Sequence, residues 1–378
     1  MKKLSILIGL ICAMSFSITA QNSNDELLKK LVEKNVLTQV EADELKEKTG
    51  SETNISKSEK IREAFNTPYM KFGGYGLLMY RYDDRAETKH KADPRAIFIS
   101  MTGKFNNFRY FILSEFVDPM LYEFYGEWAP SDAFKLKGGM MKVPYSLENQ
   151  MSLTEIETIF NTRSVSNLIG MGGDVMQLQN GKNNTGRDIG IQVHGNLFPK
   201  SGHELIQYSA GIFQGTGIKL EERNDTKDFS GALYLKPMKE FRIGSSVYFG
   251  QTNYVKAGEV LEKKHVRNRW LISSDYQTDK FYARAEYIKA NDGGIRKEAI
   301  YGTALYYLMP NKLNIVGKVD FQNGNRDINA EVVDYTAAVN YYFYPGCRFQ
   351  LNYTYSDYND KWGARNSNAI AAQMQIVF

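Results

Sequence analysis

From about residue 68 to the end of the chain, hydrophobic and polar residues alternate with a period of two. Near the end, for example, Phe349, Leu351 and Tyr353 have one parity, and Gln350 and Asn352 have the other. Alternation of this kind predicts β-strands with one apolar and one polar face. The pattern predicts sixteen strands, near residues 70–81, 95–105, 108–117, 121–129, 134–143, 187–197, 204–214, 228–237, 241–251, 267–277, 280–290, 298–308, 312–323, 332–343, 348–358 and 368–378.

The connections between these strands are alternately short and long. Asn106-Asn107 and Thr278-Asp279 are tight turns, whereas residues 144–186 form a connection of about 43 residues. Short turns at one end and longer loops at the other are typical of outer-membrane barrels, whose tilted strands need about 9–11 residues to cross a bilayer. We therefore expect an all-β fold, a transmembrane antiparallel β-barrel of sixteen strands. A soluble β-sandwich or β-helix would also alternate, but it would not explain the one-sided long loops.

The amino terminus has the form of an export signal. Lys2 and Lys3 precede an apolar stretch from Leu4 to about Phe16, which is shorter than the roughly 20 residues of a spanning helix. Small residues follow it, and we expect cleavage after Ala20. We expect a signal peptide at 1–20, a short helical periplasmic segment and linker at 21–66, and the barrel at 67–378. Both chain ends then lie at the periplasmic end, and the protein belongs in the bacterial outer membrane, in contact with its lipid.

Composition excludes several function classes. Lys and Arg number 47 against 43 Asp and Glu, and without the two signal-peptide lysines the count is 45 against 43, so nucleic acid is not an expected partner. Cys347 is the single cysteine after residue 20, so neither an intrachain disulfide nor a thiol metal cluster is expected. The four histidines are scattered without a metalloprotease or triad pattern. We expect no enzyme, no cofactor and no metal.

The candidate functional residues are basic side chains inside the barrel. A sixteen-stranded barrel is too wide for side chains to fill, so the 144–186 connection is expected to fold inward and narrow the pore. Inward Lys and Arg would concentrate anions, and arginine suits phosphate oxygens. The candidates are Lys104, Lys135, Lys137, Arg242, Arg284, Lys318 and Arg348 by strand parity, with Arg163 in the connection and Arg187 at its end. Acids such as Glu123 and Asp320 share the inward parity, so a lumen wall without net charge is an alternative.

Several runs resemble a known family. Phe134–Glu148, Gly186–Val193, Tyr208–Gly215 and Asp228–Leu233 are similar to segments of the phosphate-selective porins of the O and P type, in the form common among Bacteroidetes. The resemblance implies a sixteen-stranded barrel, a homotrimer, an inward loop and lumenal basic residues that attract anions. A dense arginine cage is not visible. In such barrels a terminal aromatic residue, here Phe378, is part of the signal read by the outer-membrane insertion machinery.

Three functions fit these observations. The first is a porin for passive diffusion of small hydrophilic solutes, anions such as phosphate among them. The second is a ligand-specific channel or binding barrel, for an oligosaccharide or another nutrient, that uses aromatic residues such as Tyr125 and Tyr282. The third is a structural barrel with a closed lumen.

Overall fold

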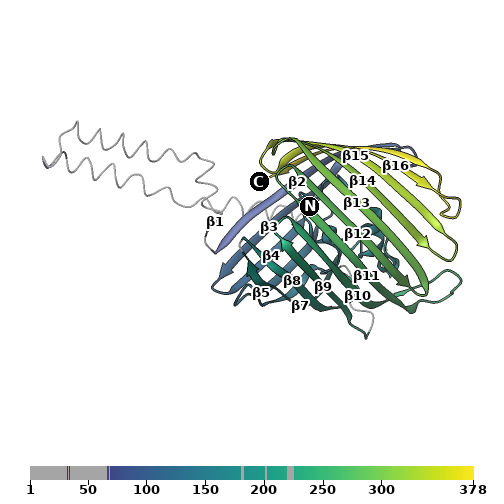
Figure 1. Cartoon of the computed structure of the whole chain (residues 1–378), viewed down its shortest axis with the longest axis horizontal. Coiled ribbons are helices and arrows are strands. Elements are labelled where there is room, and N and C mark those ends of the chain that lie inside the picture. Colours follow the sequence, from purple (N-terminus) through teal and green to yellow (C-terminus); the bar gives the residue numbers. More distant parts are fainter. Residues whose placement is uncertain are drawn as a thin grey trace, which may run out of the picture. The chain divides into compact units, whose positions relative to one another are not determined.

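Sixteen antiparallel strands close into a barrel in the computed structural model (Figure 1). The structure describes residues 66–67, 69–179, 183–200, 202–218 and 225–378, together with Val32 and Lys34. The signal peptide and the helical segment predicted before residue 66 therefore fall almost wholly outside the described residues. The strands are β2 (Met70–Asp83), β3 (His90–Phe105), β4 (Phe108–Glu115), β5 (Met120–Trp128), β6 (Lys135–Lys142), β7 (Arg187–Lys200), β8 (His203–Phe213), β9 (Asp228–Met238), β10 (Phe241–Tyr254), β11 (Lys263–Gln277), β12 (Phe281–Asp292), β13 (Ile295–Met309), β14 (Leu313–Asn325), β15 (Ala330–Tyr344), β16 (Cys347–Tyr358) and β17 (Ser367–Val377).

Each strand pairs with the next along the chain, and the last pairs with the first. The closing register runs from Ala369 opposite Asp83 to Val377 opposite Tyr75. A two-residue strand, β1 (Asn66–Thr67), adds a small hairpin to β2. The predicted antiparallel barrel of sixteen strands is confirmed. The largest difference in strand position is β3, which begins at His90 rather than near residue 95.

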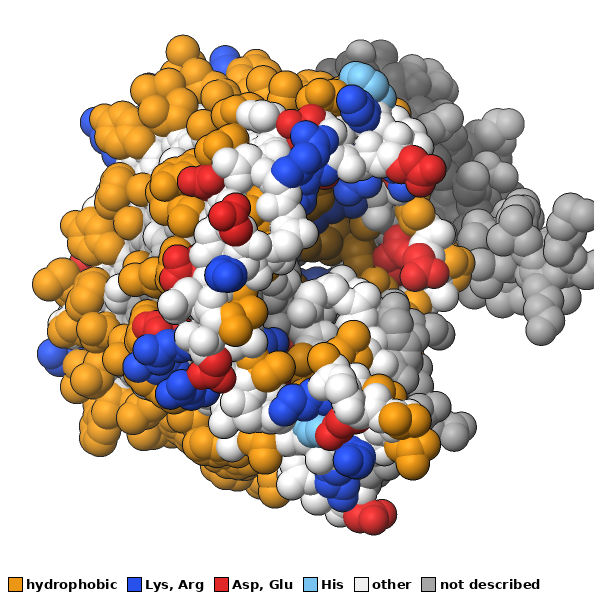
Figure 2. All heavy atoms as spheres, turned by 90° about the vertical axis from the view of Figure 1, so that its right-hand side faces the viewer, with side chains coloured by type: hydrophobic (Ala, Val, Ile, Leu, Met, Phe, Trp, Pro, Cys, Tyr) orange, Lys and Arg blue, Asp and Glu red, His pale blue; other side chains and the backbone are white. Residues whose placement is uncertain are grey.

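The barrel wall is apolar outside and polar inside. On β14, for example, Ile315 and Val319 are 43% and 49% exposed, whereas the intervening Lys318 is 7% exposed. Figure 2 shows hydrophobic side chains over the outer wall and charged side chains of both signs around an opening at one end. A charge facing lipid near the middle of a bilayer costs about 2–4 kcal/mol, which explains why the charged parity faces inward. Among the described residues, no helix has the length and apolarity to cross a membrane.

One part of the wall is lower than the rest. Strands β4, β5 and β6 have 8, 9 and 8 residues, against 14 to 16 in β2, β3 and β10. The turn between β4 and β5 is short where the alternation of loops predicts a longer connection. The Glu115 carboxylate stabilises it by accepting hydrogen bonds from the backbone N–H groups of Val117 (2.8 Å) and Asp118 (2.5 Å).

The long connection between β6 and β7 lies inside the barrel. It contains two short helices, α5 (Leu147–Gln150) and α6 (Arg163–Leu168), and a 3₁₀ turn, η1 (Val175–Gln179). Its apolar side chains, including Val165 and Leu168, pack with Leu271 and Ile288 in one buried cluster. We call residues 143–186 the inner loop. Burial of this apolar face against β11 and β12 explains why the loop turns inward instead of extending into solvent.

Candidate functional site

The first part of the inner loop is fixed to the wall by buried charges. Glu286 of β12 accepts hydrogen bonds from Ser146 Oγ (2.6 Å) and from the backbone N–H of Leu147 (2.7 Å). Arg284 of the same strand donates to Glu148 (3.0 Å) and to both oxygens of Glu157 (2.9 Å each). Arg284, Glu148, Glu157 and Glu286 are all at most 4% exposed. A charge left unpaired in such a place is strongly destabilising, so these contacts fix the position of the loop.

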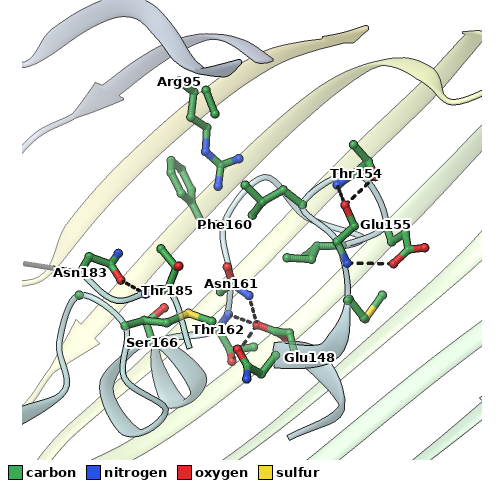
Figure 3. Close-up of a pocket in the computed structure, with 18 of the residues that line it drawn as sticks. Arg95, Glu148, Thr154, Glu155, Phe160, Asn161, Thr162, Ser166, Asn183 and Thr185 are labelled. Carbon is green, nitrogen blue, oxygen red and sulfur yellow. Dashed lines mark hydrogen bonds between the residues drawn. The ribbon is translucent and has the colours of Figure 1, made fainter. Parts of the chain in front are cut away.

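Glu148 also closes the tip of the loop on itself. Its Oε1 accepts hydrogen bonds from the backbone N–H of Thr162 (2.7 Å) and from Asn161 Nδ2 (3.1 Å), as Figure 3 shows. Residues 148 and 162 are thereby joined, and the segment between them forms a compact loop. At the base, Asn149 Nδ2 donates to the carbonyls of Val143 and Gly186, 3.1 Å from each, and so joins the two ends of the inner loop.

The segment between residues 151 and 160 is held through its backbone carbonyls. Six inward side chains from six strands donate to six of them. The donor and acceptor residues are Lys142 with Met151 (2.5 Å), Gln375 with Thr154 (3.3 Å), Arg348 with Ile156 (2.8 Å), Asn340 with Glu157 (2.9 Å), Arg95 with Ile159 (2.7 Å) and Lys318 with Phe160 (3.0 Å). Because a carbonyl carries no net charge, these bonds fix the loop without neutralising the cations.

Helix α6 continues the attachment on β14 and β15. Arg163 makes a two-pronged ion pair with Asp334, at 2.8 and 2.9 Å, and Ser164 donates to Asp320. Burial lowers the pKa of the Arg163 guanidinium, but the hydrogen bonds and charge of Asp334 outweigh burial and raise that pKa above its usual value. Arg163 is therefore a permanent cation that is matched by a neighbouring anion.

Asp174 anchors the last part of the inner loop. Its carboxylate accepts two hydrogen bonds from Arg267 (2.8 and 2.9 Å) and lies 3.4 Å from Arg269, and all three residues are 2% exposed. Burial alone would raise the pKa of Asp174, but the charges of Arg267 and Arg269 outweigh it and hold the pKa well below the usual range. Arg269 also donates to the Leu168 carbonyl at the end of α6 (2.6 Å).

An open cavity of about 1370 Å³ lies beside the inner loop. Its walls are the loop itself and inward residues of β2–β7 and β14–β17, and no residue of β8–β13 lines it. The loop thus divides the interior into a packed side over β8–β13 and an open side. Figure 3 shows Arg95 reaching from the wall toward Phe160 of the loop within this cavity. The loop narrows the lumen without filling it.

The charges that line the cavity are balanced. Among the residues that the structure describes, eight basic and eight acidic residues contribute to its surface. They are Arg81, Arg85, Arg95, Lys137, Lys142, Arg163, Arg187 and Lys318, against Asp83, Glu115, Asp118, Glu123, Glu148, Glu155, Asp320 and Asp334. The described part of the lining therefore has no excess of one sign, and the way in which individual charges are paired becomes the relevant feature.

Four of the nine predicted basic residues line the cavity: Arg163, Arg187, Lys137 and Lys318. Arg187 is ion-paired with Glu123 at 2.6 Å, and Lys137 lies 4.0 Å from Glu127. Lys318, like Arg95, donates to a loop carbonyl and has no ion pair among the described residues. The predicted basic residues therefore include some that form ion pairs with carboxylates and others, such as Lys318, that do not.

The other five lie elsewhere. Arg284 and Arg348 point inward, as parity predicts, but the inner loop covers them and they are 2% and 1% exposed. Arg242 pairs with Asp275 (2.5 Å) and Lys135 with Asp132 (3.2 Å), outside the cavity lining. Lys104 is exposed near the turn between β3 and β4.

Sequence parity missed Arg95. The register between β2 and β3 shifts so that Leu77 lies opposite Ala96 and Leu78 opposite Pro94, which leaves Arg95 as an extra residue in a β-bulge. A bulge redirects a side chain, so Arg95 reaches the lumen although its neighbour Ala96 also faces inward. Pro94, which cannot donate a ladder hydrogen bond, was the available signal for an irregularity at this point.

One wall of the cavity is aromatic. Phe98 lies with its ring centroid 5.0 Å from both Tyr75 and Tyr122, and Phe111 lies 5.5 Å from Tyr125. All five residues line the cavity. Tyr282, the other aromatic residue considered from the sequence, instead lies on the covered side and bonds to Arg284. Across the described ranges, no group of three or more His, Cys, Asp or Glu side chains is placed to hold a metal ion.

Comparisons with known proteins extend the description of the fold. No family model matches the chain, and no curated protein matches it. Solved structures do: the anion-selective porin from Comamonas acidovorans (TM-score 0.61, 11% identity, 82% of this chain and 99% of that one), and OmpT in trimer form, an outer membrane protein of Vibrio cholerae (0.58, 10%, 82% and 99%). The outer membrane channel DcaP of Acinetobacter baumannii also matches, with a TM-score of 0.56 and 10% identity over 82% of this chain and 97% of that one. At such identities the likeness concerns architecture, and this chain has the barrel fold of outer-membrane porins.

Proposed function

We propose that this protein is a passive channel of the bacterial outer membrane through which small hydrophilic solutes diffuse. The observation that carries the proposal is the inner loop, which is fastened to the wall on one side and leaves an open cavity of about 1370 Å³ on the other. A barrel that served only as a structural element would have no need to keep this passage. The export signal that the sequence predicts at 1–20 and the apolar outer wall support an outer-membrane location.

The selectivity we propose is a weak preference for anions, phosphate among them. Arg95, Lys142 and Lys318 line the cavity and donate to neutral loop carbonyls, so their charges stay available to a passing anion. The eight lining acids oppose them. The resemblance to phosphate-selective porins favours anions, but this distribution of charge does not favour exclusive passage of phosphate.

Conductance across a planar lipid bilayer tests both parts. The mature chain should form channels with steady ionic current. In a KCl gradient, the sign of the reversal potential should show that chloride is more permeant than potassium. A correctly folded barrel that carries no current would overturn the channel. A reversal potential of the opposite sign, which would show that potassium is more permeant, would overturn the anion preference but not the proposal of a channel.

The aromatic wall supports a second candidate, a channel for saccharides. Aromatic rings in a passage can pack against the apolar faces of sugar rings, and the partly exposed Tyr75 and Tyr122 lie on either side of the buried Phe98 there. A linear glucose oligosaccharide added to the conducting channel would then block the current at low concentration, and Tyr122→Leu would weaken the block. Absence of block would leave the general channel as the better description.

We also infer a homotrimer that is assembled by the outer-membrane insertion machinery. The low wall of β4–β6 supports it, because Phe108, Phe124 and Trp128 are 46%, 55% and 49% exposed on its outer face. Large aromatic side chains are enriched at interfaces between subunits. Chemical cross-linking in membranes should yield trimers, and charge substitutions at Phe124 should abolish them.

A further inference from the structure

The outer wall carries a hollow that no side chain of the described barrel fills. Six small residues from four adjacent strands form its floor: Ala283 and Ala285 of β12, Gly302 and Ala304 of β13, Gly317 of β14 and Ala337 of β15. We call this hollow the outer groove. Its volume is about 620 Å³.

The register of the strands makes the small residues continuous. Ala283 lies opposite Ala304, Ala304 opposite Gly317, and Gly317 opposite Ala337. The row is closed by tyrosines, because Ala283 is also opposite Tyr276 and Ala337 is opposite Tyr353. Four small residues in one row between two large ones produce a trough across the strands.

Two other outward strand glycines of this barrel, Gly103 and Gly126, are covered by aromatic rings. A Cβ added to Gly126 would lie 2.7 Å from the Phe108 ring, and one added to Gly103 would lie 2.4 Å from the Tyr110 ring. Such rings protect the backbone and recover apolar contact at glycine positions. A Cβ added at Gly302 or Gly317 would meet nothing within 4 Å. These two glycines are left bare on a wall whose other bare positions are few.

The dimensions of the outer groove favour a thin apolar occupant. Strands are about 4.8 Å apart, so β12 to β15 span about 14 Å, and outward positions two residues apart along a strand are about 7 Å apart. An α-helix with its side chains is about 10–12 Å wide, and a stable protein interface needs about 800 Å² from each partner. One row of alanines and glycines is too narrow to hold an α-helix and too small to form a stable protein interface.

The position of the outer groove also favours an apolar occupant. Gly302 and Gly317 lie within the spans of β13 and β14 rather than at their ends, at the level of the exposed Ile300 and Val319. This level is the middle of the apolar band, where lipid head groups do not reach. In the closed order of sixteen strands, β13 is eight strands from β5, so the groove is on the opposite side from the low wall.

We propose that the outer groove binds one acyl chain of a membrane phospholipid. The chain lies across β12–β15 over Gly302 and Gly317 and is bounded by Tyr276 and Tyr353. It supplies the apolar cover that aromatic rings provide at Gly103 and Gly126. The proposal rests on the outer-membrane location proposed above, but not on solute passage through the lumen.

Native mass spectrometry of the mature chain, released from detergent micelles with added phosphatidylethanolamine, tests the proposal. The wild type should retain one phospholipid under conditions that strip the remainder. Gly302→Leu with Gly317→Leu fills the groove and should lower the lipid-bound fraction roughly tenfold, since loss of contact with about two methylene groups is sufficient for that. Both positions have room for a side chain, so the barrel should fold normally.

Gly76→Leu is the matched control. Gly76 is also an outward strand glycine with nothing within 4 Å of an added Cβ, but it lies between the large residues Ile97 and Ile376. This variant should retain lipid like the wild type. Equal retention by wild type and the filled variant would overturn the proposal. A wild-type dimer without lipid, lost in the filled variant, would overturn it in favour of a second copy as occupant.

Conductance separates this inference from the proposed function. All three proteins should carry the same current, because the groove is on the outer wall. A wild type that binds lipid but carries no current would overturn the channel and leave the groove. A conducting wild type without retained lipid would do the reverse.

Discussion

Arg284 donates two parallel hydrogen bonds, each 2.9 Å long, to the two carboxylate oxygens of Glu157, although the residues are 127 positions apart in the sequence. Arg284 belongs to the barrel wall and Glu157 to the tip of the inner loop. Both are almost fully buried. The pair therefore connects the element that closes one side of the lumen with the element that supports it, and the width of the passage depends on such contacts.

Arg284→Ala should loosen the inner loop. The substitution leaves Glu148 and Glu157 without their cation, and breaking a buried ion pair from one side costs about 3–5 kcal/mol. The loop should then leave its position intermittently. Single-channel recordings should show larger current noise and additional conductance levels, while the barrel itself should still migrate as a folded species in electrophoresis.

Arg242→Ala is the control for this measurement. Arg242 pairs with Asp275, a wall residue, and neither residue bonds to the described residues of the inner loop. Current noise should stay at the wild-type level. Equal noise in both variants, or none in either, would show that the Arg284 contacts do not hold the loop.

Arg95→Met should reduce anion preference. Arg95 lines the cavity and bonds to the Ile159 carbonyl and the Gln373 amide oxygen, both neutral acceptors. A charge acting over about 4 Å in water contributes about 1 kcal/mol, so the chloride-to-potassium permeability ratio should fall roughly two- to fivefold. Reversal potentials in a KCl gradient measure this ratio. Lys104→Met, which removes an exposed cation from the same strand outside the cavity, should leave it unchanged; an equal shift would assign the effect to overall charge.

Strand alternation predicted the barrel because one physical contrast, lipid outside and polar lumen inside, acts on every strand. It also placed Arg284, Lys318 and Arg348 on the inner face. The path of the inner loop could not be obtained in this way. That path depends on pairs such as Asp174 with Arg267, 93 residues apart, which no local pattern connects. Whether an inward arginine lines the passage or lies beneath the loop follows from that path.

The bulge at Arg95 shows a second limit. Parity assumes an unbroken register, and a single extra residue changes the face of every side chain on one side of it. The sequence contains Pro94 as a hint, but the register shift opposite Leu77 and Leu78 is a property of the paired strands. Arg95, a lumenal cation whose hydrogen bonds go to neutral acceptors, was therefore absent from the predicted set.

Asp174→Asn should make stability less dependent on pH in the acidic range. The folded-state pKa of Asp174 lies below that of the unfolded chain, about 3.9, so the unfolded state binds the proton first as pH falls. The stabilisation by Asp174 is therefore complete above about pH 5 and is lost progressively below about pH 4. The difference in melting temperature between wild type and variant should be constant at higher pH and should shrink in acid.

Asp327→Asn provides the comparison for Asp174. Asp327 pairs with Arg296 at 2.5 Å, but both side chains are about half exposed or more, so solvent screens the pair and its removal should change the melting temperature little at any pH. Heat denaturation followed by the loss of the folded band in electrophoresis can be run over the whole pH range. A difference between wild type and Asp174→Asn that persists undiminished in acid would contradict the lowered pKa.

Phe378→Ala should affect assembly in cells more than stability in vitro. The backbone of Phe378 exchanges two hydrogen bonds with Gly74, at 2.9 and 3.0 Å, and these do not need the ring. The ring covers Gly74, where an added Cβ would lie 2.7 Å from it, but the residue is 66% exposed. Loss of a mostly exposed ring should lower the free energy of unfolding by about 1 kcal/mol.

If the terminal ring is also read by the insertion machinery, as we predict from the sequence, the amount of folded barrel in outer-membrane fractions should fall severalfold. Phe378→Tyr keeps the aromatic ring and should restore both properties. Parallel measurements of refolded protein in vitro and of assembled protein in cells distinguish the two roles. Equal, small losses in both would limit Phe378 to covering Gly74 and closing β17 against β2.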